Sequence, residues 1–334
     1  MTQRAVTVFT LGGTIAMTPS AQGGVVPTLT GAMLVAAVPQ LGSIARIDAV
    51  TFRQLPSAHL GFDDLEALAD AIRAAVAAGA RGVVVTQGTD TVEETAFALD
   101  CLLDLDAPVV VTGAMRNPSV AGADGPANLL ASVQVALGPE ARGLGCLVVM
   151  NDEVHAARFV RKTHTSSPAA FTSPLAGPLG WVGEGRVRIV LRVARVPALP
   201  PAPAPRPARV ALVTVGLGDD GTAVEALCAA GFDGLVVQGT GGGHVAPAIA
   251  AALEVAARQM PVLLASRTGT GEVLSGTYGF EGGEIDLQRR GLVRTGWLDG
   301  VKARLLLALL LRRGPVTAAQ LAAALAPWDG GPAR

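Results

Sequence analysis

The sequence predicts an α/β protein with a larger N-terminal domain, built on a mainly parallel sheet flanked by helices, and a smaller C-terminal α/β domain. Short runs of β-branched residues alternate with Ala- and Leu-rich stretches of helical periodicity, which is typical of a parallel sheet covered by helices. A Pro-rich stretch separates two series of such elements. The length of 334 residues also fits two domains.

The N-terminal series begins with a strand-like run at residues 6–11. Three further runs are expected to be strands buried on both faces, and two segments between them have helical periodicity: 82–86, 109–112 and 144–150 for the strands, 91–100 and 125–137 for the helices. Thr91 and Glu94 have the spacing of a capping box. This spacing predicts a helix that begins just after Thr89 and Asp90.

The domain boundary is expected in the Pro-rich stretch. We predict an N-terminal domain over residues 1–193, a linker over 194–208 and a C-terminal domain over 209–334. The linker reads V-P-A-L-P-P-A-P-A-P-R-P, which can continue neither a helix nor a central strand and is expected to be semi-rigid and extended.

The second series of elements follows the linker. Residues 209–216 and 234–239 have the pattern of buried strands. The apolar run 305–311 is bracketed by arginines and is too short to span a bilayer, so it is expected to be a core helix.

The composition and charge of the chain argue against some classes of function and favour others. The net charge is −1 and no long basic run occurs, which argues against nucleic acid as a partner. No signal peptide or membrane-spanning segment is visible, and three widely spaced cysteines fit buried thiols in a reducing cytoplasm. Half of the residues are hydrophobic and only 16% are charged, which is compatible with large subunit interfaces.

Metal and nucleotide cofactors are not expected. The four histidines show no zinc-like pairing. The glycine-rich run 238–244 does not match the dinucleotide-binding pattern, because His244 occupies the position of the last glycine.

Two threonines stand where strands are expected to end. Thr14 lies in T-L-G-G-T-I-A (10–16), and Thr89 lies in T-Q-G-T-D-T-V-E-E-T (86–95), followed by Asp90. Such hydroxyls, with an acid and the amine of Lys162 downstream, are candidates for nucleophilic chemistry at the carboxyl edge of the sheet. Locally the same residues also fit an ordinary helix cap, a strand-to-loop turn and a surface lysine.

Taken together with further motifs, these segments resemble the bacterial-type L-asparaginase (asparaginase/glutaminase) family. The motifs are those at 10–16, 86–95, 113–116, 123–129, 148–152, 162–163 and 177–180, with weaker matches at 266–267 and 302–304. The resemblance implies hydrolysis of the asparagine side-chain amide to aspartate and ammonia, in some members also of glutamine, without a cofactor. It also implies homotetramers or homodimers with active sites between subunits.

The resemblance also implies residue roles. Thr14 corresponds to the nucleophile that forms an acyl-enzyme. Thr89, Asp90 and Lys162 correspond to a second constellation, in which Lys162 assists Thr89 and Asp90 binds the substrate α-ammonium. Ser57 corresponds to the residue that holds the α-carboxylate.

Ala114 lies in the turn whose backbone carbonyl contacts the leaving amide in that family. Two positions depart from the family pattern, because Ala58 replaces a common glutamine and His244 stands near a common asparagine. These departures bear on substrate preference.

A third departure concerns the nucleophile. The family's segment after the first threonine carries a tyrosine that relays its proton, but residues 18–28 contain none, and Tyr278 is the only tyrosine of the chain. The loop 275–284 lies in the region that supplies an acidic residue from the neighbouring subunit. Glu284 is the first candidate for that acid and Glu281 the second, and Tyr278 is a candidate to replace the missing tyrosine in trans.

Two functions therefore remain open. The first is an amidohydrolase acting on asparagine. The alternative is a ligand-binding member of the same fold that is non-catalytic or acts on another substrate. The presence of Thr14, Thr89, Asp90 and Lys162 together favours catalysis, because a binding protein has no need of two hydroxyls and an amine.

Overall fold

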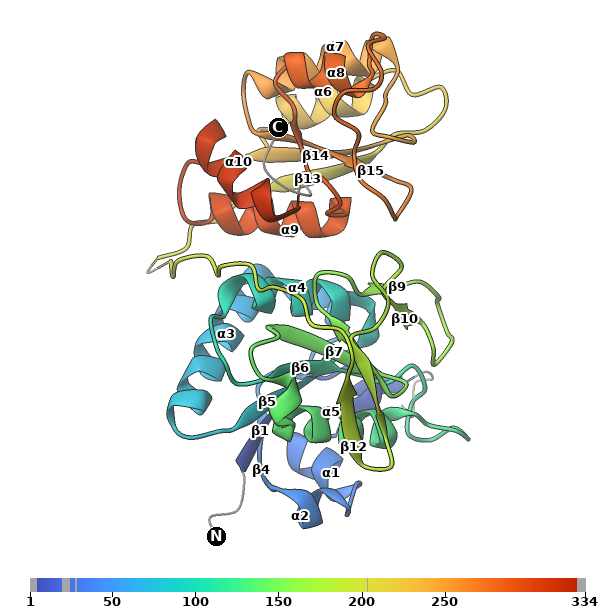
Figure 1. Cartoon of the computed structure of the whole chain (residues 1–334), viewed down its shortest axis with the longest axis vertical. Coiled ribbons are helices and arrows are strands. Elements are labelled where there is room, and N and C mark those ends of the chain that lie inside the picture. Colours follow the sequence, from blue (N-terminus) through green and yellow to red (C-terminus); the bar gives the residue numbers. More distant parts are fainter. Residues whose placement is uncertain (1–4, 20–24, 28, 203, 329–334) are drawn as a thin grey trace. The chain divides into compact units, whose positions relative to one another are not determined.

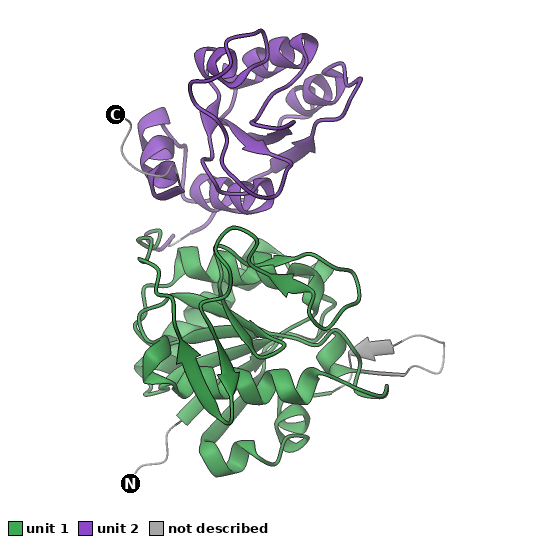
Figure 2. Cartoon of the chain, turned by 45° about the vertical axis from the view of Figure 1, so that its right-hand side comes forward, with its two compact units in different colours: residues 1–199 green, residues 200–334 purple. Residues whose placement is uncertain are grey.

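The computed structural model describes residues 5–19, 25–27, 29–202 and 204–328. The chain divides into two compact units, residues 1–199 and 200–334, which are coloured separately in Figure 2. The division falls inside the stretch 194–208, where the sequence predicts a linker.

The first unit is built on an eight-stranded sheet (Figure 1). The strands, in spatial order, are β12 (Arg186–Ile189), β11 (Gly180–Gly183), β8 (Glu153–Ala156), β7 (Cys146–Met150), β6 (Val109–Thr112), β5 (Gly82–Thr86), β1 (Ala5–Thr10) and β4 (Arg46–Thr51). The five strands from β7 to β4 are parallel to one another, and β8, β11 and β12 add antiparallel strands at the other edge. The predicted mainly parallel sheet is confirmed.

Helices cover both faces of this sheet. They are α1 (Gly31–Ala36), α2 (Leu41–Ile44), α3 (Phe62–Ala77), α4 (Val92–Leu102) and α5 (Gly125–Leu137). In Figure 1, α3 and α4 lie on one side of the sheet, and α5 with α1 and α2 lies on the other. β5 is buried along its whole length and α5 packs Leu129 and Val133 into the core, because strands covered on both faces must be apolar throughout.

Two small ribbons and four short 3₁₀ helices complete the first unit. The ribbons pair β2 (Met17–Pro19) with β3 (Val25–Pro27) and β9 (Arg161–Lys162) with β10 (Phe171–Thr172). The 3₁₀ helices are Thr14–Ala16, Ser57–His59, Thr89–Thr91 and Pro139–Ala141. Three of the four therefore contain a predicted site residue.

The capping box predicted from Thr91 and Glu94 is not formed, so this prediction is wrong. Helix α4 does begin directly after Thr91, but the Thr91 side chain makes no capping hydrogen bond. Its hydroxyl instead donates to the backbone carbonyl of Ser57 and accepts from the side chain of Gln87. Tertiary contacts have replaced the local bond that the pattern predicts.

The second unit is a smaller α/β domain, as predicted. Four parallel strands, β13 (Val210–Thr214), β14 (Gly234–Gly239), β15 (Val262–Ser266) and β16 (Val293–Arg294), form its sheet in chain order. Its helices are α6 (Thr222–Ala229), α7 (Pro247–Ala257), α8 (Glu284–Arg289), α9 (Gly300–Leu311), α10 (Ala318–Leu325) and a 3₁₀ turn, Ala326–Trp328. The expected core helix at 305–311 forms the buried end of α9. Across the described residues, every helix falls short of the length and apolarity that crossing a bilayer requires.

Candidate active site

Four predicted site residues lie just beyond the carboxyl ends of four neighbouring parallel strands. Ser57 follows β4, Thr14 follows β1, Thr89 follows β5 and Ala114 follows β6. These strands are adjacent in the order β4-β1-β5-β6, so the segments after them emerge at one edge of the sheet. Open α/β sheets bind ligands at this edge.

The turn before Thr14 is built on glycine. Gly12 and Gly13 have φ angles of 104° and 82°, which favour glycine. A Cβ atom on Gly13 would lie 1.9 Å from the backbone nitrogen of Gly88, so the two backbones are in direct contact. This contact brings the segment of Thr14 against the segment of Thr89. Thr14 itself is half-buried, and no hydrogen bond joins its hydroxyl to another residue of the described part of the chain.

The second threonine is held by charged partners. Lys162 Nζ donates to Thr89 Oγ1 at 3.0 Å and to Asp90 Oδ1 at 2.7 Å. The Asp90 side chain is 72% exposed, whereas that of Lys162 is only 14% exposed. The Lys162 amine is therefore shared between a hydroxyl and a carboxylate that remains open to a ligand.

Lys162 is positioned through its backbone. It lies in β9, which pairs with β10, and its backbone nitrogen donates to Glu93 Oε2 at 3.0 Å. Glu93 stands in the first turn of α4, so the helix that follows Thr89 also holds the strand that carries Lys162. The sequence indicates no role for Glu93, because any residue could offer the backbone nitrogen that it binds.

Ser57 approaches the same turn from the side. Its hydroxyl is buried and has no hydrogen-bond partner among the described residues. It would lie 2.8 Å from a Cβ atom on Gly88, so only glycine at position 88 allows this approach. A buried hydroxyl without a partner is suited to a polar ligand, since leaving it unpaired is unfavourable.

Ala114 is fully buried in a turn that is fixed by two polar side chains. Asn128 Nδ2 donates to the Gly113 carbonyl at 3.0 Å, and the Asp124 carboxylate accepts from the backbone nitrogens of Met115 and Arg116. Gly113 in turn packs near the Thr89 side chain.

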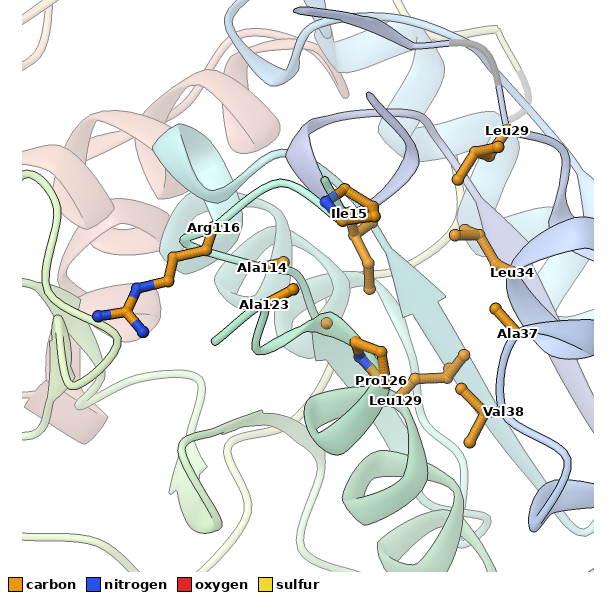
Figure 3. Close-up of a pocket in the computed structure, with 12 residues that line it drawn as sticks. Ile15, Leu29, Leu34, Ala37, Val38, Ala114, Arg116, Ala123, Pro126 and Leu129 are labelled. Atoms are coloured by element: carbon orange, nitrogen blue, oxygen red, sulfur yellow. The ribbon is translucent and has the colours of Figure 1, made fainter. Parts of the chain in front are cut away.

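An apolar hollow lies next to these segments (Figure 3). Its lining includes Ile15, Leu34, Ala114 and Leu129, and Arg116, the only charged residue of the lining, points away from them. The predicted catalytic threonines and Lys162 are absent from the lining, so this hollow is a neighbour of the site rather than the site itself.

The three residues named as candidates from a neighbouring subunit belong to the second unit. Glu284 is buried; its Oε1 accepts from the backbone nitrogens of Thr277 and Tyr278, and its Oε2 lies 3.1 Å from His244 Nε2. Burial alone would raise the pKa of Glu284, but these hydrogen bonds hold it below its usual value. Tyr278 is 44% exposed and packs edge-on against His244, with ring centroids 4.9 Å apart. Glu281 is exposed and pairs with Arg290.

The stretch 18–28, which lacks the family tyrosine, lies partly outside the described residues, since positions 20–24 and 28 are not described. Within the described part of the chain, no three His, Cys, Asp or Glu side chains gather closely enough to hold a metal ion.

Comparisons with known proteins show which family the chain is similar to. The asparaginase N-terminal domain model matches residues 5–195, and the glutaminase/asparaginase C-terminal domain model matches residues 209–324. An L-asparaginase of Bacillus licheniformis is 34% identical over 92% of this chain and 95% of its own length, and a probable L-asparaginase of Deinococcus radiodurans is 38% identical over 91% of each chain.

A solved structure extends the match to the fold. The crystal structure of a probable cytoplasmic L-asparaginase from Campylobacter jejuni superposes with a TM-score of 0.86 at 30% identity, covering 97% of this chain and 99% of that one. With both domain models matched in order along the chain, and with the two threonine segments in contact at one sheet edge, this protein belongs to the asparaginase family.

Proposed function

We propose that this protein is an L-asparaginase, an amidohydrolase that cleaves the side-chain amide of L-asparagine to L-aspartate and ammonia. The observation that carries the proposal is the contact of Lys162 Nζ with Thr89 Oγ1 and Asp90 Oδ1, at 3.0 and 2.7 Å, beside the glycine turn of Thr14. The names of its relatives support the reaction. The C-terminal domain model covers glutaminases as well, which supports glutamine as a second substrate.

The proposed reaction has two halves. The Thr14 hydroxyl attacks the amide carbon, its proton passes to the leaving nitrogen, and ammonia departs as the C–N bond breaks. Water then attacks the resulting ester and restores Thr14, with aspartate as product. A threonine hydroxyl is a weak nucleophile until a base takes its proton, so each half needs a proton acceptor. Thr89 and Lys162 supply one relay, because their functional atoms are already in hydrogen-bond contact.

Three residues bind the substrate in this proposal. Asp90 takes the α-ammonium, since its carboxylate is exposed next to Lys162. Ser57 takes the α-carboxylate through its buried hydroxyl, which lacks a partner among the described residues. The backbone carbonyl of Ala114 contacts the leaving amide. No metal or organic cofactor takes part.

The proton acceptor for Thr14 is assigned to a second copy of the chain. We propose a homotetramer or homodimer with active sites at the subunit interface, in the cytoplasm, as the description of the Campylobacter jejuni neighbour suggests. Tyr278 of the partner subunit enters the site, because its ring is exposed. Glu284 of the partner subunit is buried, and one of its oxygens lies 3.1 Å from Nε2 of His244, so it influences the site through that imidazole ring.

The role of Tyr278 is tested by Tyr278→Phe, which keeps the ring and removes the hydroxyl. We expect kcat for asparagine to fall by a factor of about 10² if the hydroxyl transfers the Thr14 proton. A Tyr278→Phe enzyme with full kcat would show that another group, or water, takes this proton.

The alternative, a ligand-binding protein of the same fold or an enzyme for another amide, is favoured by one observation: residues 18–28 contain no tyrosine. Ammonia release from asparagine and from glutamine decides between the two, with Thr14→Ala as the control. Release by the wild type, and none by Thr14→Ala, supports the amidohydrolase. Equal background release by both proteins refutes it.

A further inference from the structure

The hydroxyl of Thr91 is engaged in an unexpected place. It donates to the backbone carbonyl of Ser57 at 3.1 Å and accepts from Gln87 Nε2 at 3.2 Å. We propose that Thr91, oriented by Gln87, is a positioning residue that fixes Ser57 for binding the substrate α-carboxylate. This inference rests on the proposed function, because Ser57 matters only if it holds that carboxylate.

Thr91 does not make the helix-capping hydrogen bond that its position before α4 allows. Thr91 precedes the first residue of α4, where a threonine hydroxyl commonly accepts from a backbone N–H of the first turn. Such a cap typically stabilises a helix by about 1 kcal/mol. Thr91 makes no capping bond and reaches 34 residues back along the chain instead, so its hydroxyl serves the contact with Ser57.

Gln87 sets the direction of the Thr91 hydroxyl. Gln87 is fully buried, and its Nε2 donates both to the Gly88 carbonyl and to Thr91 Oγ1. Because Thr91 Oγ1 accepts there, its single proton is free to point at the Ser57 carbonyl. The side chains of Gln87 and Thr91 thus form a short chain of hydrogen bonds from the end of β5 to the Ser57 turn.

Ser57 needs such an anchor. It follows β4, an edge strand whose residues are mostly exposed, and it sits in a single turn of 3₁₀ helix. Its hydroxyl lies close to the backbone of Gly88, where a small shift would change its reach toward a ligand. The Thr91–Ser57 bond involves neither Thr14 nor the bond between Lys162 and Thr89, so its loss should weaken substrate binding much more than it slows the chemical step.

The test is Thr91→Val, which keeps the shape and removes the hydroxyl. We expect KM for L-asparagine and Kd for L-aspartate to rise about 3- to 10-fold, the range that corresponds to one hydrogen bond, with kcat within a factor of two of wild type. Thr91→Ser, which restores a hydroxyl, should recover most of the affinity. Thermal unfolding of each variant checks that the fold is intact.

Thr86→Val is the matched control. Thr86 ends β5 and is fully buried, whereas Thr91 is half-buried, and the Thr86 hydroxyl has no partner among the described residues, so this substitution is isosteric and removes no hydrogen bond to a described residue. It should leave KM and Kd unchanged. If Thr86→Val raises KM as much as Thr91→Val, or if Thr91→Val lowers kcat without changing KM, the positioning role is refuted.

The two proposals fail differently. A wild-type protein that binds L-aspartate but releases no ammonia from asparagine contradicts the proposed function, and the aspartate titration still tests Thr91. A wild-type protein that turns over asparagine, with a Thr91→Val variant of unchanged KM and Kd, refutes the role of Thr91 alone.

Discussion

The two threonine segments of the site touch each other but are held in different ways. Thr89 is buried and bonded to Lys162, and its segment is tied to Ser57 through Thr91 and to β9 through Glu93. Thr14 is half-buried, and its hydroxyl has no bond to another described residue. Its placement depends on the glycine turn that precedes it.

This difference fits the two roles. A residue that relays protons benefits from a fixed partner, because proton transfer needs hydrogen-bond geometry. A nucleophile must instead face the substrate, and a hydroxyl already committed to a neighbour would have to give up that bond before it attacks. The Thr14 turn is therefore positioned by packing against the fixed Thr89 segment, through the contact of Gly13 with Gly88.

The largest effect is expected from Lys162→Met, which removes the amine bonded to Thr89. We expect kcat to fall by a factor of about 10² to 10⁴, as for loss of a general acid–base group. Arg161→Met is the control: it changes the adjacent strand residue, leaves the amine of Lys162 in place and should keep kcat within a few-fold.

The Lys162→Met variant also tests which half of the reaction each threonine serves. Mass spectrometry of the acid-quenched Lys162→Met reaction should show an acyl group on Thr14 if Thr89 and Lys162 act in ester hydrolysis. An unmodified enzyme with low kcat would assign Lys162 to the attack by Thr14 instead. Unchanged kcat would remove Lys162 from the mechanism.

A smaller effect on kcat is expected from Gly13→Ala, which disrupts the contact between the turns of Thr14 and Thr89. The new Cβ would lie 1.9 Å from the Gly88 nitrogen, so one backbone must move. A displacement of about 1 Å at a catalytic group lowers kcat by a factor of about 10². Steady-state kinetics and thermal unfolding measure the loss of activity and of stability.

Gly79→Ala separates crowding from backbone strain. Gly79 also has a positive φ, 104°, but a Cβ atom there meets nothing within 4 Å. This variant should lose about 1 to 2 kcal/mol of stability from the left-handed conformation alone and keep its activity. If Gly13→Ala is as active as Gly79→Ala, the Gly13–Gly88 contact does not place Thr14.

The sequence predicts the fold better than the contacts of the site. The helix at 125–137 has the predicted bounds and the strand at 82–86 is buried throughout, because periodicity and β-branched runs report burial directly. The predicted convergence of the strand ends also holds for Thr14 and Thr89, since adjacent parallel strands share an edge. These features depend on local pattern and topology.

The remaining contacts depend on tertiary structure. Lys162 lies 72 residues from Asp90, so the sequence groups the two residues as candidates but does not predict the bond between their side chains. Thr91 fits a helix cap equally well by its local pattern, so its bond to Ser57 could not be predicted. The bond of Glu93 to the backbone of Lys162 has no sequence signature, because every residue carries that nitrogen.

Glu93→Ala should have the smallest effect on the Thr89 segment. It removes the acceptor of the Lys162 backbone nitrogen but leaves the amine, Thr89 and Asp90 in place. We expect kcat to fall by about 3- to 10-fold, the range that corresponds to one hydrogen bond, with KM nearly unchanged. Glu93→Gln should recover most of the loss, because its amide oxygen still accepts from that nitrogen. If Glu93→Gln is as slow as Glu93→Ala, the carboxylate charge matters more than the backbone contact, and Thr89 is then tuned by a second acid as well as by Lys162.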